Sequence, residues 1–293
     1  MSRPFAFLTL LLIASAWGLS ITLTKIAVST GYQPFGLIFW QLAIVTAILL
    51  PIVRAEFRKI FRRENLSLFV VIASIGTLIP NSFSYRAAVE LPAGVMAITI
   101  AMVPMFALPI SVLLRLEHVE PRRIGGVLLG AVAVLLLTAP ESSLPEPGKA
   151  IWVLVALLAP LCYGCEGNYL IFRGATGLSP AGIMFGSALV GILLITPLAA
   201  ASGQFIVPPS SFGAPEWALV GASAMHIFAY TGYVWLVGRA GAVFASMVAY
   251  LVTGLGVIWS MLLLFERYSL WIWAAFGLMM LAIWLVQPRR QPA

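Results

Sequence analysis

Long apolar stretches separated by short polar segments make up nearly all of this 293-residue sequence. Most of them run to about 20 residues, the length that a helix needs to cross ~30 Å of hydrocarbon. The pattern therefore predicts an all-α polytopic membrane protein with ten transmembrane helices and no soluble domain. The predicted spans are residues 5–28, 34–53, 66–85, 93–114, 124–138, 151–172, 181–201, 217–237, 242–264 and 270–286.

The sequence repeats itself at half its length. "TGYQPFGLIF" at residues 30–39 aligns with "TGLSPAGIMF" at 176–185, with identical letters at five of ten positions and an offset of 146. The pair "WG" at 17–18 aligns with "YG" at 163–164 at the same offset, which drifts to 148–149 further along the chain. The chain is therefore predicted to contain two copies of one five-helix unit.

Residues 1–140 form the first predicted repeat, 141–149 a connecting loop and 150–293 the second repeat. Because five is an odd number, the second repeat must enter the membrane from the opposite side. Inverted repeats of this kind recur in secondary transporters, whose binding sites lie between the repeats near the membrane midplane. The repeat thus predicts transport by alternating access through a central cavity.

Composition and charge support the membrane prediction and orient it. The chain is 61% hydrophobic and 9% charged, against about 25% charged residues in soluble domains. Thirteen of the 17 Lys and Arg lie in the loops that would be cytoplasmic with a cytoplasmic N-terminus, as the positive-inside rule requires. Both termini are therefore predicted to be cytoplasmic. The basic segment 54–64 fits a membrane anchor better than a nucleic-acid site, although binding of acidic lipid stays open.

The first 16 residues also have the outline of a cleavable signal peptide: a basic residue, an apolar core and an Ala-x-Ala end. The apolar stretch continues beyond Ala16, and the repeat requires the whole first helix. We therefore expect this segment to be retained as a transmembrane helix.

Particular motifs resemble the drug/metabolite transporter superfamily, EamA type. They are the "WG" pair with a lysine eight residues after the tryptophan, and the "P…P…LLRLE" pattern that ends the fourth span. The residues are Trp17, Gly18, Lys25, Pro104, Pro109 and Glu117. One departure is that the second repeat has Ile171 at the position of Lys25, so the repeats differ in charge.

The resemblance implies an exporter of small organic solutes in the bacterial inner membrane. Overall size, ten helices and an aromatic-rich interior are similar to the aromatic amino-acid exporters of that superfamily. Drugs, nucleosides or other metabolites are the alternative substrates. The expected partners are a small-molecule substrate and the lipid bilayer, with no nucleic acid, cofactor or metal. We expect no enzymatic activity, because the sequence lacks a recognisable nucleophile–base set or metal motif. The sequence does not indicate the oligomeric state.

Candidate site residues follow from polar and aromatic side chains at helical spacing within the spans, because such stripes line cavities. Polar groups there also serve as packing contacts between helices, and aromatic rings also fill space, so both interpretations stay open. The candidate substrate-binding residues are Trp17, Asn81, Tyr85, Thr99, Met102, Tyr163, His226, Tyr230, Tyr233 and Tyr250.

Ionisable residues within spans cost roughly 2.5–3.5 kcal/mol each at the helix centre, so Lys25, Glu166 and His226 are candidates for a charge or proton role. Lys25 near a membrane edge also fits a side chain that reaches out to the interface. Candidate hinges are Pro104 in the fourth span and Gly254 and Gly256 in the ninth. Each weakens a helix at a corresponding place in its repeat.

Two weaker motifs stay open. "CYGC" at 162–165 has thiol-redox spacing, but packing by two small residues is the favoured interpretation within an apolar helix. The GxxxG pairs at 126–130 and 182–186 permit close helix contacts, either inside the protein or in a dimer.

Overall fold

The computed structural model describes residues 3–118, 120–138, 144, 148–173, 177–240, 244 and 247–287. Every secondary-structure element in this part of the chain is a helix. The connecting loop predicted at 141–149 lies largely outside the described residues.

Helices cover most of the described residues of all ten predicted apolar runs. In the first half these are α1 (Arg3–Val28), α2 (Pro34–Leu49), η1 (Arg54–Glu56), α3 (Phe57–Ile60), η2 (Arg63–Asn65), α4 (Leu66–Ala73), η3 (Ser74–Leu78), α5 (Ile79–Glu90), α6 (Ala93–Ile100), α7 (Val103–Leu113) and α8 (Pro121–Thr138). In the second half they are α9 (Ala150–Ala156), α10 (Leu158–Arg173), α11 (Pro180–Ala201), α12 (Ala214–Ala240), α14 (Val248–Leu264) and α15 (Leu270–Val286).

Many of these helices are long and apolar enough to cross a membrane. Seven candidate spans meet that criterion within the described residues, and α2 with the turn up to Ile60 gives an eighth candidate that is bent by 90°. The helices α14 and α15 are apolar but shorter. The protein is therefore an integral membrane protein of the polytopic helical class, and the count of ten spans stays a prediction.

Prolines alter the course of three spans. A proline lacks the N–H that bonds the carbonyl four residues earlier, and its ring clashes with that carbonyl. The carbonyl four residues before Pro104 belongs to Ile100, where α6 ends, and the one before Pro160 belongs to Ala156, where α9 ends. The one before Pro80 belongs to Gly76, which lies in the π-helical turn η3.

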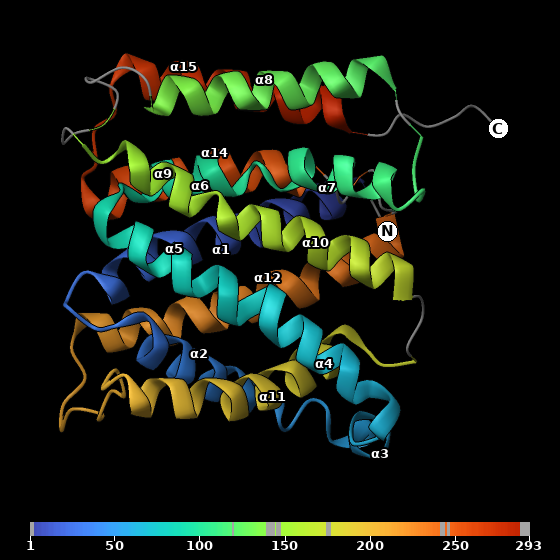
Figure 1. Cartoon of the computed structure of the whole chain (residues 1–293), viewed down its shortest axis with the longest axis vertical. Helices are drawn as coiled ribbons and strands as arrows, with labels where there is room; N and C mark the ends of the chain where they lie inside the picture. The colour runs from blue at the N-terminus through green and yellow to red at the C-terminus, as the bar shows by residue number, and fades with distance from the viewer. Residues whose placement is uncertain are drawn as a thin grey trace.

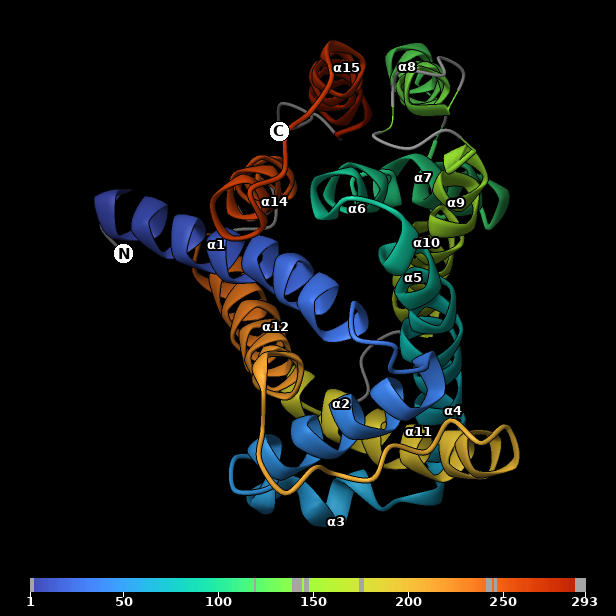
Figure 2. The same cartoon turned by 90° about the vertical axis from the view of Figure 1, so that its left-hand side faces the viewer.

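The helices pack in pairs that run across the two halves of the sequence. At one end of the long axis α8 lies beside α15, and at the other end α2 lies beside α11 (Figures 1 and 2). Between these pairs, α1 packs on α12 and α14, and α10 packs on α5 and α7. The start of α1 and the end of α15 lie on the same side as α3 (Figure 1). We call this side the α3 side.

Two corresponding backbone caps join α2 and α11. On the α3 side, the Ser179 N–H donates to Glu56 Oε2 at 2.9 Å, at the start of α11. On the opposite side, the Phe35 N–H donates to Gln204 Oε1 at 3.1 Å, at the start of α2. Each cap uses a side chain from the segment after the other helix, so each helix begins against the end of its neighbour.

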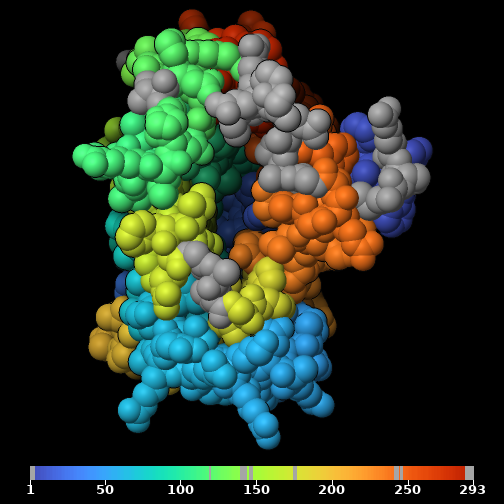
Figure 3. All heavy atoms as spheres, turned by 90° about the vertical axis from the view of Figure 1, so that its right-hand side faces the viewer, coloured from blue at the N-terminus to red at the C-terminus, as the bar shows by residue number. Residues whose placement is uncertain are grey.

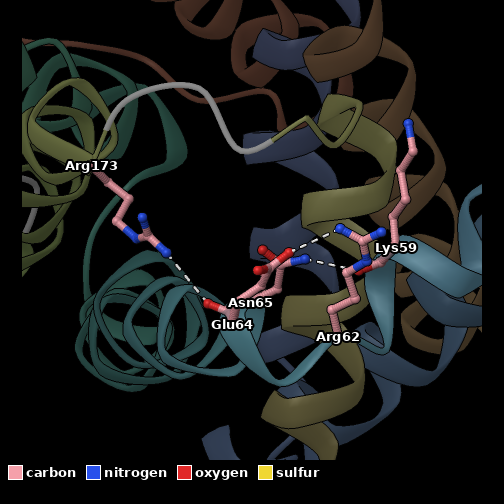
Figure 4. A network of polar contacts seen from close by, with 5 residues as sticks. All are labelled: Lys59, Arg62, Glu64, Asn65 and Arg173. Atoms are coloured by element: carbon pink, nitrogen blue, oxygen red, sulfur yellow. Dashed lines mark hydrogen bonds and ion pairs between the residues drawn. The ribbon is translucent and has the colours of Figure 1, made fainter.

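The polar segment between α2 and α4 is held by further contacts on the α3 side. The Asn65 amide donates to the Lys59 carbonyl at 2.8 Å, and Arg62 pairs with Glu64 at 3.2 Å. Arg173, at the end of α10, donates to the Glu64 carbonyl at 3.3 Å (Figure 4). These contacts fix the basic segment to both α4 and α10.

A glycine at position 18 is required by the crossing of α1 and α14. A Cβ atom added there would lie 2.7 Å from the backbone nitrogen of Gly256, which cannot move aside as a flexible side chain would. We therefore expect Gly18→Ala to lower the free energy of unfolding by about 1–3 kcal/mol through overpacking.

Thermal unfolding in detergent measures this effect, with Gly277→Ala as the matched control. Gly277 lies within α15 and has open space around its missing Cβ. An alanine there should leave stability unchanged or raise it by about 0.5–1 kcal/mol. Equal midpoints for the two variants would contradict the close crossing.

Candidate functional site

The α3 side is hollowed at its centre. In the space-filling view, the hollow lies between green-to-yellow segments on one side and orange segments on the other, with the dark-blue N-terminal segment visible at its floor (Figure 3). By their colours, these walls belong to the region of α7 and α10 and to the region of α12 and α14. Side chains from the facing helices can therefore meet a solute that enters from this side.

An aromatic cluster joins α1 to α12. The Trp17 ring lies edge-on to His226 at a centroid distance of 6.0 Å and to Tyr233 at 6.2 Å. All three side chains are half-buried, and their spacing of seven residues on α12 places His226 and Tyr233 on one helix face. Sequence reasoning selected each of these residues, and the structure brings them together.

A polar network joins α2, α5 and α10. The Asn81 Nδ2 donates to Gln41 Oε1 at 2.8 Å, and the Tyr85 hydroxyl donates to the same oxygen at 2.6 Å. The Tyr163 hydroxyl donates to Asn81 Oδ1 at 3.3 Å. The structure thus brings together three of the predicted residues around Gln41, which the sequence analysis missed.

Gln41 could not be found by searching for polar residues repeated at helical spacing. It is the only side-chain amide within α2, so no polar neighbour at helical spacing accompanies it. The cost of burying a bulky polar group in an apolar span was the available signal.

Glu166 lies on α10 one turn after Tyr163, against the π-helical turn of the third span. A Cβ atom added to Gly76 would lie 2.4 Å from Glu166 Oε1, so the carboxylate sits over the backbone of η3. Such π-turns occur frequently at functional sites. The absence of a side chain at Gly76 makes room for this carboxylate.

Tyr230 connects the two groups of residues. It lies on α12 between His226 and Tyr233, and it interacts electrostatically with both Glu166 and Tyr233. Glu166 also interacts with Tyr163, which belongs to the polar network. The predicted residues of α1, α5, α10 and α12 therefore form one connected region.

Three other predicted residues have contacts outside these two groups. Thr99 is fully buried, and its hydroxyl donates to the Met96 carbonyl within its own helix at 2.8 Å. Met102 packs against Gly130 of α8. Tyr250, near the start of α14, packs against the large hydrophobic core cluster. These three contacts are those of helix packing.

The predicted hinges differ from each other. The fourth span is interrupted between Ile100 and Val103, next to Pro104, whereas α14 runs unbroken through Gly254 and Gly256. A Cβ atom at Gly256 would lie 2.9 Å from the Cβ of Ala97. Gly256 therefore serves the close contact of α14 with α1 and α6.

The GxxxG pairs make internal contacts. A Cβ atom at Gly126 would meet Val286 of α15 at 2.6 Å, and one at Gly186 would meet the Phe69 ring of α4 at 2.4 Å. In the CYGC motif, Cys162 and Cys165 are both free and half-buried. Among the described residues, no group of three or more His, Cys, Asp or Glu side chains is placed to hold a metal ion.

Lys25 lies at the end of the molecule opposite the α3 side. Its ammonium donates to the carbonyls of Ala88 and Val89 at 2.6 and 2.9 Å. These carbonyls end α5, where a cation is favourable to the helix dipole. Lys25 and Glu166 thus have separate surroundings. Beside Lys25, the ion pair of Lys149 with Glu90 helps to line a cavity of about 330 Å³.

Glu266 binds the start of α6, next to the end of α5 to which Lys25 binds. Its carboxylate accepts from the N–H groups of Ala93 and Gly94 at 2.8 and 3.2 Å, at the start of α6, and from the Tyr268 hydroxyl at 2.5 Å. Burial and this hydrogen bond raise the pKa of Tyr268, so the phenol keeps its proton and donates a hydrogen bond to the carboxylate. The corner between α5 and α6 is therefore held by charged groups from α1 and from the end of α14.

Comparisons with known proteins agree with this architecture. Residues 4–139 match the model of the EamA-like transporter family, and this match covers the first predicted repeat. No curated protein matches the sequence. Sixteen chains among the solved structures match. One crystal structure has a TM-score of 0.61 at 17% identity over 97% of this chain and 96% of that chain, which shows a shared fold.

Proposed function

We propose that this protein is a membrane transporter that exports small organic solutes by alternating access through the central hollow. The match of residues 4–139 to the EamA-like transporter family supports transport of small solutes across a membrane. The most favoured substrates are amino acids with aromatic or other large apolar side chains. Their export follows from the resemblance to aromatic amino-acid exporters such as YddG.

The observation that best supports this substrate class is the pairing of an aromatic cluster with a polar network. Trp17, His226 and Tyr233 offer ring faces and edges to an apolar side chain. The network around Gln41 offers hydrogen bonds, and Glu166 offers a negative charge. An amino acid has the matching parts: an apolar side chain, a carboxylate and an ammonium group.

Two inverted repeats are the structural basis of the proposed mechanism, and matched contacts support them. Gly18 packs on Gly256, and Gly164, which is 146 residues after Gly18, packs on Ala107 with a Cβ-to-nitrogen distance of 3.0 Å. Ala107 and Gly256 are 149 residues apart. Residues related by the repeat thus make equivalent contacts, which two halves with opposite orientations can exchange during transport.

The proposed orientation places the α3 side in the cytoplasm, with both termini, in the bacterial inner membrane. Most of the basic residues of the described loops lie there, among them Arg58, Arg62 and Arg173. The positive-inside rule supports this orientation.

Uptake into proteoliposomes tests the proposed function with labelled Phe, Trp, Met, Thr and a drug-like cation. We expect Phe and Trp to move fastest. Trp17→Ala and Tyr230→Ala should each lower Phe transport about tenfold, since loss of an aromatic partner costs roughly 1–2 kcal/mol.

Trp217→Ala is the matched control, because the Trp217 side chain is 62% exposed on the outer surface of α12. It should transport Phe as the unmodified protein does. Transport of the cation alone would instead favour the drug and metabolite alternative, and equal loss in Trp217→Ala would refute the proposed site.

A further inference from the structure

The side-chain amide of Gln41 is oriented by its neighbours. A carboxamide oxygen has two lone pairs, and at Gln41 both are used, by Asn81 Nδ2 and by the Tyr85 hydroxyl. Both donors lie on α5, one turn apart. The oxygen of Gln41 therefore points towards α5, and its nitrogen points away from these donors.

The rest of the network is satisfied in the arrangement that the structure shows, with the Gln41 oxygen directed towards α5. Asn81 directs its oxygen to the Tyr163 hydroxyl and its nitrogen to Gln41. Reversing the Gln41 amide alone would set its NH₂ against the NH₂ of Asn81, and the hydrogen bond would be lost. The directions of the three bonds are mutually consistent, as expected of a network that fixes one geometry.

The Gln41 nitrogen is the donor that remains at the end of this network. Within the described residues, no hydrogen bond from Gln41 Nε2 to the protein is present, and the side chain is half-buried. An amide nitrogen carries two N–H donors and no acceptor. Such a group, fixed in direction and without a protein acceptor, is suited to an oxygen atom of a ligand.

We propose that Gln41 recognises the carboxylate of the transported solute, and that the solute is a zwitterion whose ammonium group is received by Glu166. The inference rests on the proposed function and deepens it. Tyr163 links the two recognition groups: its hydroxyl bonds Asn81, and Glu166 follows it by one helical turn on α10. Gln41 then determines specificity for amino acids over amines of the same shape.

Gln41→Glu separates recognition from structural support. A carboxylate at this position still accepts hydrogen bonds from Asn81 and Tyr85, so the network within the protein is kept. The ligand-facing NH₂ group, however, becomes an oxygen that repels a carboxylate. We expect uptake of L-Phe to fall by about tenfold to a hundredfold, the value of a hydrogen bond to a charged group plus repulsion.

The comparison substrate is 2-phenylethylamine, which keeps the ring and the ammonium but lacks the carboxylate. Its uptake should be as fast in Gln41→Glu as in the unmodified protein, or faster. Thermal stabilisation of the detergent-solubilised protein by L-Phe gives a second readout that does not require transport. L-Phe should raise the unfolding midpoint of the unmodified protein and not that of Gln41→Glu.

The outcomes distinguish this inference from the proposed function. If the unmodified protein moves no amino acid, the proposed substrate class is wrong and the inference falls with it. If it moves L-Phe and Gln41→Glu moves L-Phe equally well, only the role of Gln41 is wrong. Equal loss of L-Phe and 2-phenylethylamine uptake would assign Gln41 a structural role and overturn the inference.

Discussion

Replacing Glu166 by glutamine is expected to lower amino-acid transport at least tenfold while leaving the fold intact. The carboxylate lies in a membrane-spanning helix, where an ionised side chain costs roughly 2.5–3.5 kcal/mol unless it faces a cavity or a partner. It rests on the backbone at Gly76 and interacts with Tyr163 and Tyr230. Glutamine keeps the shape but removes the charge that would receive an ammonium group.

Uptake of L-Phe with and without a pH gradient measures this effect and examines coupling at the same time. If Glu166 carries a proton as well as binding the solute, the gradient should accelerate transport by the unmodified protein and leave Glu166→Gln unaffected. Glu64→Gln is the control, because its side chain is 64% exposed on the α3 side. Unchanged transport in Glu166→Gln would exclude both roles of this carboxylate.

The helices could be predicted from the sequence because each apolar run carries its own signal of length and composition. The match between segments 30–39 and 176–185 also has a local cause. A Cβ atom at Gly36 would lie 2.2 Å from the Gln204 carbonyl, and one at Gly182 would lie 2.7 Å from Glu56 Oε2. Each glycine admits the segment that caps its helix, so the repeated letters mark a repeated contact.

The candidate site was predicted in part, for reasons that differ between residues. The stripes with Asn81 and His226 were visible because several polar residues share one helix face. Gln41 has no such companions on α2, and its partners become neighbours only when α5 packs beside α2. Tyr250 fitted a stripe pattern equally well, but whether a residue of a stripe packs into the hydrophobic core, as Tyr250 does, depends on neighbouring helices that periodicity does not encode.

The breaks within the spans also depend on neighbouring helices, which the sequence pattern does not encode. Pro104 and Pro160 predict an interruption four residues earlier, and α6 and α9 end there. Pro80 has the same effect on hydrogen bonding, yet its span continues through a π-turn instead of breaking. Which outcome occurs depends on the neighbouring helix, and here the Glu166 side chain occupies the space above Gly76.

Removing the contacts at the corner between α5 and α6 is expected to open the side opposite α3. Glu266 caps the start of α6 and Lys25 binds the end of α5, so two separate elements hold one corner. Loss of a helix cap costs about 1 kcal/mol and up to ~2 kcal/mol. Glu266→Ala should therefore shift the equilibrium towards an outward-open state by about tenfold, since 1.4 kcal/mol corresponds to that factor.

The native cysteines provide the measurement, because Cys162 and Cys165 flank Tyr163 in the central region. A membrane-impermeant maleimide added outside cells should label Glu266→Ala and Lys25→Ala about tenfold faster than the unmodified protein, in line with the population shift. A variant with both cysteines replaced by serine gives the background. The direction of access follows the proposed orientation, in which the α3 side is cytoplasmic.

Glu56→Ala is the matched control for this experiment. Glu56 caps the start of α11 as Glu266 caps the start of α6, but it does so on the α3 side. Its loss removes a cap of the same kind without releasing the α5–α6 corner, so labelling from outside should not increase. If Glu56→Ala accelerates labelling as much as Glu266→Ala, the effect is general loosening of the protein, and the corner is not a gate.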